Sequence, residues 1–161
     1  MTFLAGEDAN SKRVNEELGW GIRKNSDQSV TSSTTLVSDA ELTWPVDANV
    51  NYVFDMDLVY TGANGAGNLN IGWAVPSGAI MSWSATGLDT SLGYKNVGNL
   101  AAATASAYGT AGAAIGRIVQ VSGYLHVDST AGNFVLRFAQ ATSNGTATTM
   151  RAGSFGVVYR A

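Results

Sequence analysis

The sequence contains no cysteine, and this absence removes several classes of chemistry at once. None of its 161 residues can form a disulfide, act as a thiol nucleophile or bind a metal through a thiolate. Histidine occurs only once, as His126, so a metal site would need several convergent carboxylates. No apolar run approaches the roughly 20 residues that a membrane-spanning helix needs, so we expect no membrane partner.

Charged residues are also scarce. They make up 13% of the chain, whereas an average soluble protein has roughly 25%. The formal net charge is −3, so nothing favours nucleic acid as a partner, which would need a basic face. A surface with so little charge is typical of a protein that neighbours cover within an assembly.

The first 27 residues differ from the rest because charge is densest there, with nine of the 21 charged side chains. Their opening, MTFLAGEDANSKRVNEEL, has no long apolar core, which predicts synthesis in a cytoplasm and no secretory signal. Residues 8–18 are compatible with a short helix, which would be marginal without a packing partner. The segment is then either a frayed terminus or an arm that docks on a partner. We favour a docking arm over residues 1–27, with contacts from Phe3, Leu4, Val14, Leu18, Trp20 and Ile22.

The segment NVNYVFDMDLVY, residues 49–60, predicts the longest strand of a sheet. Its apolar residues recur at every second position, which places them on one face of a strand, whereas a helix would scatter them. Asp55 and Asp57 fall on the opposite face, together with Val53 and Val59. The buried face is expected to consist of Val50, Tyr52, Phe54, Met56, Leu58 and Tyr60.

The remainder of the chain also has strand character. Pro45 indicates an edge strand, and the small-residue stretch 86–114 predicts a long loop with one short strand at 92–97. About eight or nine strands without helical periodicity predict one all-β domain over residues 28–161, an antiparallel jelly-roll sandwich. The other strands are expected at residues 29–37, 41–46, 68–75, 79–85, 117–127, 133–140 and 154–160, the last with Phe155, Val157 and Tyr159 on one face.

Candidate catalytic residues are few. His126 lies on the polar face of its strand without a GxSxG motif, so we interpret it as a polar residue on a sheet face. Asp55 and Asp57 share a strand face roughly 7 Å apart, a separation that a glycosidase uses and that any solvated strand also has. We therefore predict no enzyme, no catalytic residue, no cofactor and no metal ion, with a glycosidase as the alternative.

Aromatic residues raise a further alternative, because such side chains stack on sugars in carbohydrate-binding sandwiches. Trp73 and Trp83 lie in register with core residues, which predicts that both are buried. A host-surface glycan is therefore kept as an alternative partner. The stacking candidates are Trp44, Trp73, Trp83, Tyr94 and Tyr108.

Several segments carry a resemblance to a known group of proteins. They are KNSDQSVTSSTTLVSDAEL (24–42), NYVFDMDLVYTGA (51–63), IGWAVPSGAIM (71–81), and FVLRFAQATSN with TTMRAGSFGVVYR (134–160). These segments resemble jelly-roll virion surface proteins of tailed bacteriophages, especially those that infect actinobacteria. The opening FLAGEDA with Val14 and Asn15 is similar to the start of phage fibre and tail proteins. The jelly roll also resembles the tumour-necrosis-factor type, which implies a three-fold trimer.

The resemblance implies a non-enzymatic structural protein on the virion surface, a trimeric decoration that docks on the head through its arm. Its partners would be itself, as a homotrimer, and the major capsid protein or another virion protein. A tail-fibre or baseplate module for host attachment is the alternative. Physical reasoning points to the same assembly, because Val53 and Val59 leave apolar surface opposite the core face, and such surface usually meets another subunit.

Overall fold

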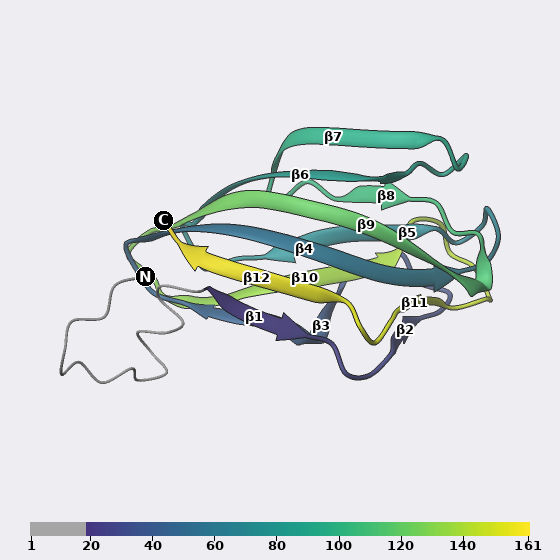
Figure 1. The fold of residues 1–161 in the computed structure, drawn as a ribbon, viewed down its shortest axis with the longest axis horizontal. Helices are drawn as coiled ribbons and strands as arrows, with labels where there is room; N and C mark the ends of the chain where they lie inside the picture. The colour runs from purple at the N-terminus through teal and green to yellow at the C-terminus, as the bar shows by residue number, and fades with distance from the viewer. Residues whose placement is uncertain (1–18) are drawn as a thin grey trace, which may run out of the picture.

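The computed structural model describes residues 19–161, and within this range the chain forms twelve strands and no helix. The strands form two sheets that face each other, as Figure 1 shows. The predicted all-β sandwich is therefore confirmed. The strands are β1 (Trp20–Arg23), β2 (Gln28–Val30), β3 (Val37–Val46), β4 (Val50–Gly62), β5 (Leu69–Ala74), β6 (Ile80–Leu88), β7 (Tyr94–Ala101), β8 (Ser106–Tyr108), β9 (Gly112–Val127), β10 (Gly132–Gln140), β11 (Thr148–Met150) and β12 (Phe155–Arg160).

The order of the strands is that of a jelly roll. The large sheet runs β1-β12-β4-β9-β6-β7, with β11 pairing both β2 and β4, and the small sheet runs β3-β10-β5-β8. The chain changes sheet between β3, β4 and β5, and again between β8, β9 and β10, as two Greek keys require. The hairpin of β6 and β7 is an addition that widens the large sheet beyond β9.

The core lies between the two sheets and is dominated by aromatic rings. Phe134 from the small sheet stacks on Trp73 with ring centroids 5.0 Å apart and meets Phe54 of β4 at 4.9 Å. Such offset and tilted contacts are the favoured geometries for aromatic pairs. The inward residues of β4 are those that the alternation predicted, and Trp73 and Trp83 are buried, as expected.

Two regions differ from the sequence-based expectations. The strand predicted over 29–37 ends at Val30, and the chain passes through Ser32 at a φ of 53° before β3 begins at Val37. The long loop expected over 86–114 is wrong in part, because β7 extends from Tyr94 to Ala101, β8 pairs with β5, and β9 already begins at Gly112. β8 and residues 112–116 of β9 consist largely of Ala, Gly and Ser, so they form backbone hydrogen bonds of a sheet without an apolar alternation that would predict a strand.

The chain joins the sandwich before residue 27. β1 is antiparallel to β12, with Trp20 opposite Val158 and Ile22 opposite Gly156, so Trp20 and Ile22 belong to the large sheet. The expected helix at 8–18, with Phe3, Leu4, Val14 and Leu18, lies outside the described residues. Between Gly19 and the C-terminus no helix is long and apolar enough to cross a membrane.

Candidate functional site

The outer face of the large sheet carries two rows of polar side chains across its central strands. One row follows the pairing of Asp55 on β4 with Ser122 on β9 and Ser84 on β6. The next row joins Asp57, Gln120 and Thr86 in the same way, with Asn96 of β7 beyond. Because paired residues point to the same side of a sheet, these side chains share one surface.

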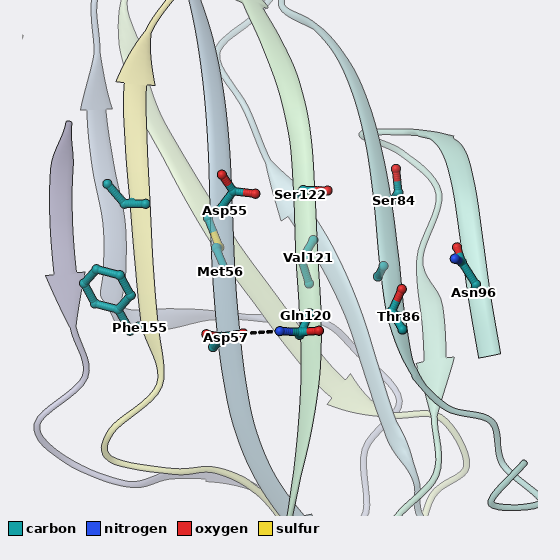
Figure 2. A pocket seen from close by; sticks show the side chains of 12 residues that line it. Asp55, Met56, Asp57, Ser84, Thr86, Asn96, Gln120, Val121, Ser122 and Phe155 are labelled. Carbon is teal, nitrogen blue, oxygen red and sulfur yellow. Dashed lines mark hydrogen bonds between the residues drawn. The ribbon is translucent and has the colours of Figure 1, made fainter. Parts of the chain in front are cut away.

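These two rows line a shallow groove with a volume of about 580 Å³. In Figure 2 the labelled side chains of Asp55, Asp57 and Gln120 lie side by side on two neighbouring strands, with Phe155 at one border. Gln120 Nε2 donates a hydrogen bond to Asp57 Oδ1 at 3.2 Å. None of the residues that line the groove is basic, so it presents hydrogen-bond acceptors and negative charge.

The geometry of the two carboxylates does not suit a glycosidase. Asp55 and Asp57 project from the exposed face of one interior strand, rather than from two walls that flank a substrate bond. Hydroxyl and amide groups surround them instead of the apolar pocket that keeps a catalytic acid protonated. The arrangement is suited to binding hydroxyl-rich ligands through several weak contacts.

Apolar side chains occupy the outer face on both sides of the polar rows. Towards one end, Val53 is paired with Tyr124, and both are 40% exposed. Towards the other end, Val59 is paired with Ile118, which is 56% exposed. The outward position of Val53 and Val59 agrees with the sequence-based expectation. The sheet therefore presents a polar centre between two apolar borders.

In the C-terminal strand β12, the face that carries Phe155, Val157 and Tyr159 points outward, although large apolar side chains usually face the core. Phe155 is 42% exposed and borders the groove with Val157, whereas Gly156 and Val158 are buried. The reason lies at Gly156, where a Cβ atom would stand 2.7 Å from the Trp44 ring. Trp44 already fills this part of the core, so only glycine fits there and its neighbours face outward.

His126 is held by neighbouring strands on the same outer face. Its Nδ1 lies 2.7 Å from Asn51 Oδ1, which also accepts a hydrogen bond from the Tyr124 hydroxyl at 2.8 Å. Residues 19–161 contain no group of three or more His, Asp or Glu side chains that could hold a metal ion. Its position agrees with its interpretation as a polar residue on a sheet face.

Most of the aromatic residues considered for sugar stacking are not accessible. Trp44, Trp73, Trp83 and Tyr108 are buried in the core, which confirms the expected burial of Trp73 and Trp83 and removes all four as stacking candidates. Tyr94, at 76% exposed, is the member of this set that remains on the surface. Sequence reasoning missed Phe155 as a surface aromatic, because its alternation with Val157 resembled a core face.

The candidate docking residues are only partly within the described region. Trp20 is 40% exposed on β1, and its carbonyl oxygen accepts a hydrogen bond from Trp44 Nε1 at 2.8 Å. Ile22 packs against the core as a partly buried residue. Phe3, Leu4, Val14 and Leu18 precede the described residues, so a docking role for the segment stays a prediction.

Comparisons with known proteins give few matches. No family model matches the chain, and no curated protein matches its sequence. A structure of the Gx strain of infectious bursal disease virus is similar at 10% identity over 86% of this chain and 35% of that chain, with a TM-score of 0.22. The VP2 subviral particle of that virus is 8% identical over 88% of this chain and 41% of that chain, also at 0.22. The chain thus spans about two fifths or less of these proteins, and a likeness this weak carries no argument.

Proposed function

We propose that this chain is a non-enzymatic structural protein of a tailed-phage virion and decorates the capsid surface as a homotrimer. The observation that supports the proposal most is the set of apolar side chains exposed on the outer face of the large sheet. Ile118 is 56% and Phe155 is 42% exposed, although β9 and β12 are interior strands of that sheet. Apolar groups in the middle of a sheet face are typical of a surface that another subunit covers.

The occupant we propose for this face is a second copy of the same chain. The contact is proposed at the apolar border formed by Val59 and Ile118, so the carboxylates of Asp55 and Asp57 in the polar centre lie outside it. A stable interface buries about 800 Å² per partner, and each Å² of apolar surface contributes about 25 cal/mol. Val59 and Ile118 form a contiguous border that can contribute to such an area.

The N-terminal arm is the proposed link to the capsid. In this proposal it contacts the major capsid protein or another virion protein, while the jelly roll faces outward. Contacts of this kind would strengthen the joints between capsid subunits against the pressure of packaged DNA. Each contact needs only modest strength, because many copies act on one particle.

Deleting residues 2–18 is expected to abolish binding to DNA-free capsid shells, because the proposed capsid contacts lie there. β1 and its pairing with β12 remain, so the truncated protein should stay a folded trimer. Cosedimentation with purified shells measures binding, and light scattering with circular dichroism reports assembly and folding. Undiminished binding of the truncated protein to shells would exclude the arm as the docking element.

A second candidate function is attachment to the host surface through a saccharide, and the groove on the large sheet favours it. Asp55, Asp57, Asn96 and Gln120 offer hydrogen-bonding groups that suit sugar hydroxyls, and Phe155 offers an apolar surface beside them. The two functions make different demands on the same face, which a sister chain covers in one case and which stays open in the other.

Under this second function, Asp57→Ala is expected to weaken binding of a cell-wall saccharide about tenfold or more, because a hydrogen bond to a charged group contributes about 1.5–3 kcal/mol. Asn133→Ala, an exposed position on the small sheet, is the matched control and should leave affinity unchanged. Titration calorimetry with host cell-wall fragments measures both. Equal affinity for Asp57→Ala and the unaltered protein would remove the groove as the binding site.

A further inference from the structure

A lysine, an aspartate and a glutamate from the two sheets meet at one edge of the sandwich. Lys24 directly follows β1 of the large sheet, whereas Asp39 and Glu41 lie on β3 of the small sheet. Lys24 Nζ is 3.0 Å from Asp39 Oδ1 and 3.6 Å from Glu41 Oε1. The side chains of Lys24 and Asp39 are both 0% exposed, so this contact is closed to solvent.

The backbone holds the lysine in place from both sides. Lys24 N–H donates to Ser154 O, and Gly153 N–H donates to Lys24 O, each at 2.8 Å. β1 and β3 contact each other, and Figure 1 shows them side by side at the edge of the sandwich. The backbone hydrogen bonds of Lys24 and the contact between β1 and β3 thus hold Lys24 and Asp39 next to each other.

The two oxygens of the Asp39 carboxyl group have very different surroundings. Oδ1 accepts the backbone N–H groups of Glu41 at 2.9 Å and Leu42 at 3.0 Å, in addition to Lys24 Nζ. Oδ2 is buried and has no hydrogen-bond partner among the described residues. For a permanent ion pair this is costly, because a buried charged oxygen needs its own hydrogen bonds.

The same asymmetry suits substitution at the carboxyl carbon. Two backbone N–H groups aimed at Oδ1 can stabilise negative charge that develops on that oxygen, as an oxyanion hole does. Oδ2, to which no group in residues 19–161 donates a hydrogen bond, is then the oxygen that can leave. Lys24 Nζ, 3.0 Å from Oδ1, is the nitrogen in contact with this group.

We propose that Lys24 and Asp39 join in an intramolecular isopeptide bond. One proton passes from the Lys24 ammonium to the carboxylate and comes to rest on Oδ2. The lone pair of Nζ attacks Cγ, which forms the C–N bond and places negative charge on Oδ1. A second proton moves from nitrogen to Oδ2, the Cγ–Oδ2 bond breaks, and water leaves. One ammonium and one carboxylate thus become one amide and one water, with no oxidant or cofactor.

Glu41 is a positioning residue in this step. The Glu41 carboxylate accepts hydrogen bonds from the Ser26 hydroxyl and from the Asn25 N–H. These bonds, that of Ser26 most strongly, lower the pKa of Glu41 to about 2. The carboxylate is therefore ionised at neutral pH, close to Lys24 Nζ. It can stabilise the positive charge on the attacking nitrogen while the C–N bond forms.

Burial and contact favour the amide over the separate groups. Intramolecular groups held in contact react as if at effective concentrations of about 10⁵–10⁸ M, which offsets the unfavourable balance of amide formation in water. Desolvation also penalises the charged pair, whereas an amide at this position carries no charge. In a chain without cysteine, the bond would clasp the edges of the two sheets as a disulfide does elsewhere.

The test is the intact mass of the purified full chain under denaturing conditions. The unaltered protein is expected to weigh one water molecule less than its sequence, and Lys24→Arg and Asp39→Ala should each show their full sequence mass. A protease digest should yield a branched peptide that joins Lys24 to Asp39. Full sequence mass in the folded, unaltered protein would overturn the proposal. So would a loss of water that maps to another site.

Glu41→Gln adds a readout for the positioning role. This variant keeps the hydrogen-bond acceptor but loses the charge beside Lys24, so the crosslinked fraction in freshly purified protein should fall several-fold. A fraction equal to that of the unaltered protein would remove Glu41 from the reaction. The mass of the unaltered chain decides the proposal even if a variant fails to fold.

Discussion

Replacing Asp39 with alanine is expected to lower the free energy of unfolding by about 3–5 kcal/mol, because it leaves a buried lysine with only the more distant carboxylate of Glu41. Lys24 is 0% exposed, and its contact with Asp39 connects the large sheet to the small sheet. Two backbone N–H groups on β3 also lose their acceptor. Denaturant unfolding followed by tryptophan fluorescence measures the change, and a loss below about 1 kcal/mol would contradict it.

A double variant shows how the two groups stabilise the fold. Lys24→Met with Asp39→Asn removes both charges and keeps an oxygen that can accept the N–H groups of Glu41 and Leu42. Replacing a buried ion pair by uncharged groups is often neutral for stability. If the pair is not covalent, the double variant should recover most of the stability that Asp39→Ala loses. If the isopeptide bond forms in the unaltered protein, as we expect, the double variant should remain less stable, because it lacks the covalent constraint.

Ile118→Lys is expected to convert the proposed homotrimer into single chains. The side chain is 56% exposed on an interior strand, beside Val59, where a sister chain is proposed to cover it. A lysine there places an unpaired charge in an apolar interface, and disruption of a central contact costs about 2 kcal/mol or more. Sedimentation velocity should show a single slower species over the concentration range in which the unaltered protein sediments as a trimer.

The matched control for Ile118→Lys is Val37→Lys. Val37 is an exposed apolar residue of β3, on the small sheet. Its substitution also replaces an apolar side chain by lysine, but away from the proposed interface. This variant should remain a trimer. If both variants dissociate, or if neither does, the outer face of the large sheet is not the interface. An unchanged far-ultraviolet circular dichroism spectrum for Ile118→Lys would show that the body itself is folded.

The sequence predicts those strands in which apolar and polar side chains alternate. In β4 the alternation from Tyr52 to Tyr60 identifies the strand, its buried face and the outward carboxylates. In β8 and the start of β9 the residues are small, and tertiary pairing with β5 and β4 defines the strands instead. Pairing of this kind depends on distant segments, so no local pattern predicts it.

The candidate sites follow the same division. The alternation of apolar and polar residues in β4 predicts that Asp55 and Asp57 point outward. The groove, however, also needs Gln120, Asn96 and Phe155, which come from strands far apart in the chain. The face that Phe155 occupies is decided by the Trp44 ring, which leaves room only for Gly156.

Lys24 shows most clearly where sequence reasoning stops. A lysine in a charged segment is normally solvated, so residues 1–27 read as an exposed arm. In the structure this lysine is buried, and its partner Asp39 lies 15 residues further along the chain on the other sheet. Its burial depends on the fold of both sheets, and no sequence motif around Lys24 predicts its contact with Asp39.

We propose that sister chains cover the outer face of the large sheet. Sedimentation equilibrium of the purified, unaltered protein is the decisive test of this claim. The expected result is a single species with three times the mass of one chain, stable on dilution. A protein that sediments with the mass of one chain at all concentrations would contradict the claim.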